Sequence, residues 1–479
     1  MIRNLTGLLS GLVLLLLLTG AAAAAGHERL VFLVPDTATG SLAQGIEVFR
    51  RDNPGLTERL KITVYSEPEL IEGRDKPEFG GGDVIFFYHL NYQVMLGLEE
   101  DLRRARAAGA QVMGLGSYQI FARKGFYNVS LDEHPAIDTY WENNGAENVK
   151  RLIGYLANRF CGLAEVAVLE PLTQPQQGIF HPDAPGTRIF VSLSEYKAWY
   201  ASSQHVKKAP WVGILSYNVV KIGDSKVPEA VIRKLEAEGL NVICAIGYPA
   251  DTLIEDYFMA EEGKVDALIS LMFSHPKEKA LKLLTGLNLP VIRAVNLYNE
   301  LAKWETDSRG IEPLQLAPQV FMPELCGLIE PIVVGGKRLH RDEKTGIEVT
   351  ERVPHAERIA RLVGRVQAWV KLRTLSNADK KVALLYYNNP PGKHNIYASY
   401  LDVFASMQTL LEGLAVAGYR FTENGNFSKE TLQDLILRQG RNIGTWAPGE
   451  IEKLVKSGLV TLVPLAAYKS WFAELPESF

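Results

Sequence analysis

The sequence predicts an α/β protein in which several parallel-sheet units are joined by an irregular connector. Short apolar runs, rich in residues that suit a sheet, alternate with segments whose apolar residues recur at the helical period, which is typical of parallel sheets covered by helices. Polar loops follow many of these runs. The 479 residues exceed the usual length of one domain, and 47% of them are hydrophobic, which suffices for more than one core.

The first 25 residues have the three regions of a secretory signal peptide. A short, weakly positive start at Met1–Asn4 precedes an apolar run from Leu8 to Leu18, and the small residues Ala21–Ala25 suit cleavage. We therefore expect an exported protein, periplasmic or membrane-associated, and a cytoplasmic one if the signal is not used. An uncleaved N-terminal anchor is the alternative, although the run is short for a bilayer.

Residues 26–200 are expected to form an N-terminal α/β domain. Its predicted strands, with helices between them, are Leu30–Pro35, Leu60–Val64, Asp83–Tyr88 and Gln111–Gly114. Asp36 follows the first strand and is interpreted as a helix-capping group, with a ligand as the alternative. His89, at a strand end beside Asn91, is a candidate metal ligand, with a hydrogen-bonded histidine as the alternative. An irregular crossing over Glu170–Ser192 ends this domain.

Residues 201–300 are expected to form a second α/β domain. Its predicted helix is Pro228–Glu238, with a proline in the first turn. Its predicted strands are Trp211–Ser216, Asn241–Ala245, Asp266–Leu271 and Pro290–Asn296. These spacings suit a flavodoxin-like or Rossmann-like parallel sheet. His275, near the end of the third strand, is a second candidate metal ligand, and a capped loop is the alternative.

The alternation of strands and helices lapses over residues 301–376, which we interpret as a connector. Gly335–Arg338 is expected to be a hairpin turn, and Val353–Leu375 an amphipathic helix. The basic residues of this helix are interpreted as a solvated face.

Residues 377–479 are expected to form a further α/β unit. Lys381–Tyr387 is the predicted strand, a polar loop follows it, and a helix spans Leu401–Ala415 with Gly418 as its C-terminal cap. Because ligands gather at the carboxyl ends of parallel strands, the loop residues are candidate ligand-binding or support residues. They are Asn388, Asn389, Lys393, His394 and Asn395. The alternative is a turn whose amides cap the helix. The loop lacks the glycine and hydroxyl pattern of a phosphate-binding loop.

Charge and cysteine content exclude some classes of function. The formal net charge is −4 and there is no polybasic run, which argues against a nucleic-acid partner. Cys161, Cys244 and Cys326 have neither zinc-site nor redox-motif spacing, so we expect buried free thiols and at most one disulfide. The chain also lacks the sequence patterns of a catalytic triad, an HExxH pair or a dinucleotide fingerprint.

Four separated segments carry a family resemblance. They are Gly178–Asp183, Phe321–Pro331, Tyr386–Ile396 with the following Ala398–Val403, and Gly440–Glu450. Their residues and order resemble CobN, the large subunit of cobaltochelatase, and the related H subunit of magnesium chelatase. The resemblance covers roughly residues 27–479. Tyr397 stands where the family usually has a glycine, and the segments characteristic of the family's carboxyl-terminal part are not in this sequence.

This resemblance implies a role in metal insertion into a tetrapyrrole. In such chelatases the large subunit binds the tetrapyrrole and receives the metal, and separate ATPase subunits supply the driving force. The implied substrates are a corrinoid precursor or haem and Co²⁺, with ATP used only through partner subunits, in cobalamin biosynthesis. Beside the loop residues, His181 and Glu324 become candidate pocket residues. The family's large subunits are much longer, so the chain is expected to be an N-terminal portion that needs a CobN-like C-terminal portion and is not catalytic alone.

Two other functions remain open from the sequence. The signal-peptide pattern favours an exported protein that binds haem or another metallo-tetrapyrrole, or a metal-removing chelatase, in an uptake system. A third interpretation is a non-catalytic binding protein that closes over a small molecule between the units at 211–296 and 381–463.

Overall fold

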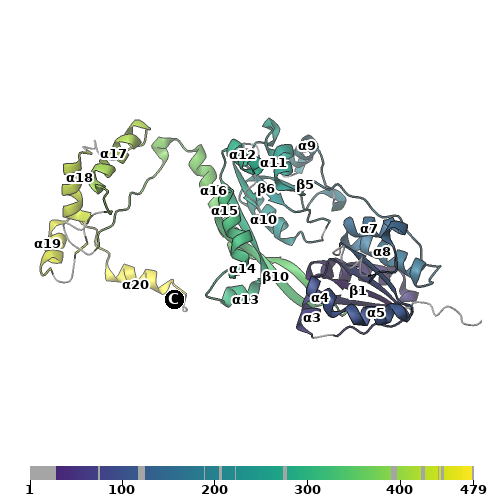
Figure 1. Ribbon diagram of the computed structural model, residues 1–479. Helices are drawn as coiled ribbons and strands as arrows, with labels where there is room; N and C mark the ends of the chain where they lie inside the picture. Colours follow the sequence, from purple (N-terminus) through teal and green to yellow (C-terminus); the bar gives the residue numbers. More distant parts are fainter. Residues whose placement is uncertain are drawn as a thin grey trace, which may run out of the picture. The chain divides into compact units, whose positions relative to one another are not determined.

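The computed structural model divides the chain into two compact units, Met1–Val370 and Lys371–Phe479 (Figure 1). The described residues are 29–73, 76–116, 125–187, 189–203, 206, 208–221, 223–272, 278–389, 396, 398–421, 427–440, 442–443 and 447–476. Both sheets belong to the first unit. The α/β class expected from the sequence is confirmed, whereas the finer domain boundaries stay predictions.

The first sheet, sheet A, has four parallel strands among the described residues, in the order β2-β1-β3-β4. Its strands are β1 (Arg29–Val34), β2 (Lys61–Ser66), β3 (Asp83–Tyr88) and β4 (Gln111–Leu115). All four strands expected in this region are confirmed. The central strands β1 and β3 are predictable because strands buried on both faces of a parallel sheet leave near-continuous apolar runs.

Helices cover both faces of sheet A. Leu30 and Phe32 of β1 pack against α2, α7 and α8, whereas the alternate residues Val31 and Leu33 pack against α4 and α5. The helices of this region are α2 (Thr39–Asp52), α3 (Glu67–Glu72), α4 (Tyr92–Gly97), α5 (Glu99–Ala107), α7 (Pro135–Glu142) and α8 (Gly145–Phe160).

The second sheet, sheet B, has seven strands among the described residues, in the order β11-β10-β9-β8-β6-β7-β5. The five strands from β10 to β7 are mutually parallel, and β5 and β11 are antiparallel edge strands. The strands are β5 (Gly178–Phe180), β6 (Trp211–Ser216), β7 (Asn241–Ile246), β8 (Ala267–Ser270), β9 (Val291–Glu300), β10 (Ile329–Arg341) and β11 (Glu348–Pro354).

Sheet B is also covered on both faces. One core contains residues of α10 and α16, and the other contains residues of α9 and α11 with α12 packed against it. These helices are α9 (Leu193–Ser203), α10 (Lys226–Ala237), α11 (Ala250–Phe258), α12 (Glu278–Leu287) and α16 (Ala356–Thr374). The expected helices at Pro228–Glu238 and Val353–Leu375 are confirmed with small shifts of their ends.

The hairpin expected at Gly335–Arg338 is wrong, because these residues lie inside β10 and the chain reverses between β10 and β11 instead. A Cβ atom on Gly335 would lie 2.6 Å from the carbonyl oxygen of Val353. The glycine therefore permits close strand approach rather than a turn. Residues 329–354 of the expected connector thus extend sheet B.

The β10–β11 hairpin also joins the two sheets. Ile347 and Val349 are buried in the core of sheet A beside α2. The backbone N–H of Thr350 donates to Oγ1 of Thr39 at 2.9 Å, and Lys337 forms an ion pair with Asp36. A strand pair of sheet B therefore supplies part of the packing of sheet A.

A helical segment connects β9 to β10. It consists of α13 (Leu301–Thr306), α14 (Pro313–Leu316), the π-helical turn η6 (Ala317–Phe321) and α15 (Met322–Leu325), the last three being continuous. π-Helical turns are rare and are frequently found at functional sites.

The second unit, Lys371–Phe479, has no strand among its described residues. The strand expected at Lys381–Tyr387 is wrong: Val382 is 51% and Leu385 97% exposed, and no neighbouring described strand offers backbone partners. The helix expected after the loop is confirmed as α17, and Gly418 beyond it has φ +85°. The helices are α17 (Val403–Val416), α18 (Lys429–Leu435), η8 (Ile436–Gly440, π-helical), α19 (Glu450–Ser457) and α20 (Leu465–Ala473).

Cys161, Cys244 and Cys326 are free and buried, as expected. Burial raises the pKa of the Cys161 thiol to about 12. Across the described residues, no helix has the length and hydropathy that crossing a bilayer requires.

Candidate functional site

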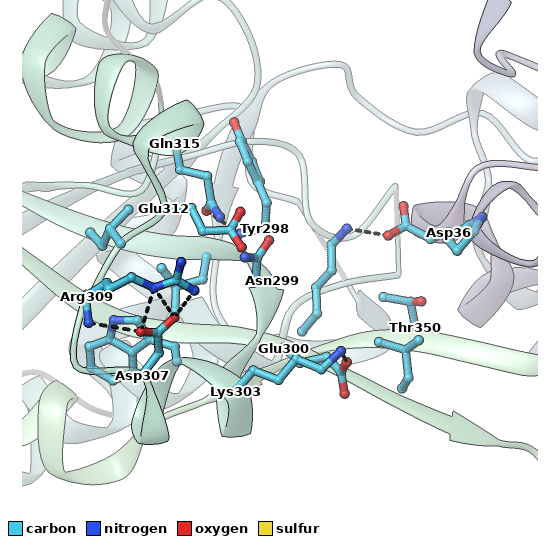
Figure 2. Close-up of a pocket in the computed structure, with 17 residues that line it drawn as sticks. Asp36, Tyr298, Asn299, Glu300, Lys303, Asp307, Arg309, Glu312, Gln315 and Thr350 are labelled. Atoms are coloured by element: carbon cyan, nitrogen blue, oxygen red, sulfur yellow. Dashed lines mark hydrogen bonds and ion pairs between the residues drawn. The ribbon is translucent and has the colours of Figure 1, made fainter. Parts of the chain in front are cut away.

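A cavity of about 450 Å³ lies where chain segments leave the carboxyl ends of strands in both sheets (Figure 2). Asp36 follows β1, Pro68 follows β2, and residues 297–300 are the end of β9. Its volume is within the range of about 300–1,000 Å³ typical of small-molecule sites. It is lined by Asp36, Pro68, Leu297, Tyr298, Asn299, Glu300, Lys303, Trp304, Asp307, Arg309, Gly310, Ile311, Glu312, Gln315, Lys337, Leu339 and Thr350.

Most charged groups of this cavity, which we call the cleft, form ion pairs. Arg309 donates hydrogen bonds to both carboxylate oxygens of Asp307. Its Nε lies 3.0 Å from Oδ1 and 3.2 Å from Oδ2, and its Nη2 lies 2.8 Å from Oδ2. Hydrogen bonds from Arg309 lower the pKa of Asp307 to about 2. Asp36 lies on the other side of the cleft (Figure 2) and forms an ion pair with Lys337. Lys303 pairs with Glu300 in the same way.

Aromatic and aliphatic side chains supply the apolar part of the cleft. Tyr298 is 36% exposed, and burial of its ring raises the pKa of its hydroxyl. Its backbone N–H donates to Oε1 of Gln315 at 2.9 Å, which ties α14 to the end of β9. Trp304 and Ile311 both pack against the adjoining small core. Aromatic faces next to paired cations and carboxylates suit a planar ligand that carries acidic groups.

Two smaller hollows adjoin the cleft, since they share lining residues with it. One, of about 140 Å³, shares Lys337 and Thr350. The other, of about 90 Å³, shares Tyr298 and lies at the carboxyl ends of β6, β8 and β9. In this second hollow the Oδ1 atom of Asn296 is buried and has no hydrogen-bond partner among the described residues. A ligand larger than the cleft therefore has further space beside it.

No described group of three or more His, Cys, Asp or Glu side chains is arranged to hold a metal ion.

His181 does not line the cleft. It is 1% exposed, its Nε2 lies 2.9 Å from a carboxylate oxygen of Glu236, and its Nδ1 lies 3.1 Å from the backbone N–H of Asp183. The rings of Trp199 and Tyr200 pack edge-on against it. Both ring nitrogens thus have partners inside the fold, which is typical of a structural histidine, and a ligand-binding role for it stays a prediction.

Glu324 lies on α15, is exposed, and is not among the residues that line the cleft. His89 is also exposed, at the end of β3, with φ +43° and its Nδ1 2.7 Å from the carbonyl oxygen of Gly116. If Nδ1 carries the proton in that contact, Nε2 is the ring nitrogen that can ligate. No structural observation brings these two residues together.

The second unit holds part of the predicted loop. Asn388 is buried, and its Oδ1 and carbonyl oxygen each accept a hydrogen bond of 2.6 Å from Asn442. Asn389 is exposed and donates to the hydroxyl of Tyr387 at 2.9 Å. Tyr386 also donates to the carbonyl of Gly440. The structure thus joins the loop to the segment Gly440–Glu450. Lys393, His394 and Asn395, and likewise His275, lie outside the described residues.

Sequence reasoning misses most of the cleft. Asp36 is predicted to cap a helix, and Tyr298, Trp304 and Lys337 come from β9 and the segment interpreted as a connector. One signal is available, because Asn296 ends a predicted strand, where ligands gather. The pairing of Lys337 with Asp36, 301 positions apart, leaves no local pattern.

A family model and individual relatives both relate this chain to chelatase subunits. The family model for CobN/Magnesium Chelatase matches residues 138–479. The chain is 28% identical over 325 residues to the magnesium-chelatase H subunit of Rhodobacter capsulatus, which covers 62% of this chain and 26% of that protein. It is 24% identical over 311 residues to the CobN subunit of the aerobic cobaltochelatase of a Sinorhizobium species, covering 62% and 24%.

A solved structure shares the fold. The catalytic subunit of cobaltochelatase from Mycobacterium tuberculosis superposes with a TM-score of 0.57 at 19% identity, over 94% of this chain and 35% of that one. The chain spans about a quarter of the length of the curated relatives it matches. Because the matched family model extends over well more than half of its residues, the chain belongs to the CobN/magnesium chelatase family.

Proposed function

We propose that this chain is the tetrapyrrole-binding portion of a CobN-like cobaltochelatase large subunit. Its role would be to hold a corrinoid precursor while Co²⁺ is inserted during cobalamin biosynthesis. The observation that carries this proposal is a cleft with aromatic and charged walls, at the carboxyl ends of strands of two sheets, in a chain of this family. Family membership alone would leave the binding surface unspecified.

The cleft offers the contacts that such a ligand needs. Tyr298 and Trp304 can stack on the macrocycle, and stacked aromatic pairs contribute about 0.5–1.5 kcal/mol beyond area burial. Lys303, Arg309 and Lys337 can meet the acidic groups at the macrocycle's edge. Each cation already has a carboxylate partner, so the ligand would exchange with or extend an existing ion pair.

Metal insertion also needs a group that accepts the pyrrole protons. Asp307 is a weak base, because its hydrogen bonds with Arg309 lower its pKa to about 2. Glu312 lines the same cleft and is the better candidate proton acceptor. The metal is a substrate in this scheme, delivered to the bound macrocycle rather than held by a resident site.

The remaining functions belong to partners. ATP would be hydrolysed by separate chelatase subunits, since no phosphate-binding loop motif occurs in this sequence. A CobN-like C-terminal portion would complete the large subunit, because the chain spans only about a quarter of the relatives' length. The chain by itself would then bind substrate without turning it over.

A second candidate function rests on residues 1–25, whose pattern is that of a signal peptide. An exported family member would bind haem or another metallo-tetrapyrrole, or remove its metal, as part of an uptake system. Cell fractionation distinguishes the two: a periplasmic or membrane-associated protein supports this candidate, and a cytosolic protein with its start retained contradicts it.

Separate titrations of the purified chain with cobalt-free corrinoid, haem and Co²⁺ test the proposal. We expect saturable absorbance changes with the cobalt-free corrinoid, weak or no binding of Co²⁺ alone, and metal insertion only when the C-terminal portion, ATPase subunits and ATP are added. His394→Ala should be titrated in parallel, because this residue is a predicted support residue. Tight binding of intact haem, unaffected by partners and ATP, would favour the binding-protein function instead. Absence of binding to any tetrapyrrole would refute both.

A further inference from the structure

The continuous helix formed by α14, η6 and α15 buries polar side chains and exposes apolar ones, which is the opposite of an ordinary surface helix. Gln315 and Gln319 are 4% and 1% exposed, whereas Leu314, Phe321 and Leu325 are 90%, 53% and 66% exposed. A surface helix of a soluble protein normally buries its apolar face and exposes its polar one. We call the exposed set the outward face; its members are Leu314, Phe321, Met322 and Leu325.

The buried glutamines fix this orientation. Oε1 of Gln315 accepts from the backbone N–H of Tyr298 at 2.9 Å, and Nε2 of Gln319 donates to the carbonyl of Asn296 at 2.8 Å. Arg293 donates to the side-chain and backbone oxygens of Gln319 from a buried position. Rotating the helix to bury its apolar side would break these buried hydrogen bonds, each costing about 1–3 kcal/mol. The outward face is therefore a property of the folded unit.

Exposing this apolar surface to water is unfavourable. Fully burying one large apolar side chain contributes about 1.5–3 kcal/mol, so a partner that covers the outward face is stabilised by the burial of several side chains. Exposed apolar side chains scattered singly need no explanation, but a contiguous set along one helix marks an interaction surface. None of the four outward residues lines the cleft, whereas the inward Gln315 does.

We propose that the outward face is the docking surface for the part of the large subunit that relatives carry outside the region matched here, whether joined to this chain or made separately. This inference rests on the proposed function. That part of the family's chain is large, since the matched region is 26% of one relative and 24% of another. Through Gln315 and Gln319, the docked segment would rest on the helix that positions the end of β9, and hence Tyr298, at the cleft.

Photo-crosslinking in the source organism tests this proposal. A photoreactive phenylalanine analogue replaces Leu314 in the full chain, and the same analogue replaces Ile71, which is 63% exposed on α3, as the matched control. We expect position 314 to cross-link to a CobN or magnesium-chelatase polypeptide, at residues outside the portion that aligns with this chain. Cross-links confined to another copy of this chain, to this chain's own residues, to lipid or to an unrelated protein would overturn the proposal, as would equal yields at both positions.

Charge substitution gives a second readout. Leu314→Asp combined with Leu325→Asp should reduce co-purification of the cross-linked polypeptide at least roughly tenfold, as expected for anchor residues of an interface. Ile71→Asp should leave co-purification unchanged. Because both substituted side chains point to solvent, the thermal transition of the purified chain should not move, and corrinoid titration should be unaffected. Unchanged co-purification overturns the docking surface, whereas failed corrinoid binding by the wild-type chain refutes the proposed function.

Discussion

At the scale of single residues, Arg293 organises one wall of the site. It is 1% exposed, and its guanidinium donates to the backbone carbonyls of Ser270, Met272 and Ala294 and to Gln319. Desolvation lowers its pKa to about 10, so it remains charged at neutral pH. It therefore ties the segment after β8 and the π-helical turn to β9.

Arg293→Met should destabilise the first unit strongly. The substitution leaves several buried carbonyl oxygens without donors, and each costs about 1–3 kcal/mol, so we expect a loss on the order of 3 kcal/mol or more in the free energy of unfolding. Arg233→Met is the matched control, because the Arg233 side chain is 54% exposed and pairs with Asp183 on the surface. It should cost roughly 0–1 kcal/mol. Urea denaturation measures both; equal losses would contradict this account.

Glu330 gives a prediction for the pH dependence of stability. It has φ +50°, and its carboxylate accepts from Arg365 at 2.5 and 2.6 Å and from Nε1 of Trp369 at 2.9 Å. The hydrogen bond with Arg365 is the largest of the causes that lower its pKa from the ordinary value of 4.5. Since the folded-state pKa lies below the unfolded one, the stabilisation is fully present above about pH 4.5 and is lost as pH falls through the folded-state pKa.

The free energies of unfolding of the wild-type chain and Glu330→Gln should therefore converge as pH falls. Above pH 5 we expect the variant to be less stable by roughly 1 kcal/mol, the usual value for a partly exposed pair. Denaturation measured between pH 3 and 7 supplies the difference curve. A difference that is constant across this range would mean that ionisation of Glu330 does not contribute.

At the scale of elements, the β10–β11 hairpin contributes to the packing of sheet B on sheet A. Ile347 is 7% and Val349 6% exposed, both within the core beside α2. Ile347→Ala should cost about 2–5 kcal/mol, as other large-to-small core substitutions do. Ile71→Ala, at a residue that is 63% exposed, should stay within about 0.5 kcal/mol. Calorimetry of the two variants checks this; an Ile347→Ala protein as stable as the control would show that the hairpin does not contribute to the core.

Strands could be predicted from the sequence where both faces of the strand are buried. The runs at Asp83–Tyr88 and Asn241–Ala245 are strands because helices cover both faces, so their apolar residues are continuous. Lys381–Tyr387 has a similar composition but finds no strand partner among the described residues, and its apolar side chains are exposed. Gly335 and Gly336 resemble a turn locally, yet they let strands approach closely. Pairing and packing at long range decide these cases.

The cleft could be predicted only in part, for a related reason. The rule that ligands gather at the carboxyl ends of strands located Asn296, which lies beside the cleft residue Tyr298. Lys337 and Thr350 reach the cleft because β10 and β11 extend sheet B. The sequence pattern of these two strands did not predict strands, and the segment was interpreted as a connector. His181, which stood out in the sequence, is instead enclosed by Glu236, Trp199 and Tyr200.

At the scale of the whole molecule, two sheets present strand ends to one cleft, and the family relationship adds the expectation of a tetrapyrrole. The shared fold with a cobaltochelatase catalytic subunit covers 94% of this chain but 35% of that protein. All residues that line the cleft belong to the first unit, so the proposed binding can be tested apart from metal insertion.

Whether the cleft binds the tetrapyrrole is tested by the dissociation constant for cobalt-free corrinoid, measured for the wild-type chain and for Tyr298→Ala combined with Lys337→Met. Loss of one stacking face and one cation should weaken binding by at least roughly tenfold, which corresponds to about 1.4 kcal/mol. The control combines Tyr248→Ala and Lys282→Met, at exposed positions that do not line the cleft, and should bind as the wild type does. Equal affinity in all three proteins would contradict the account, because the tetrapyrrole would then bind elsewhere.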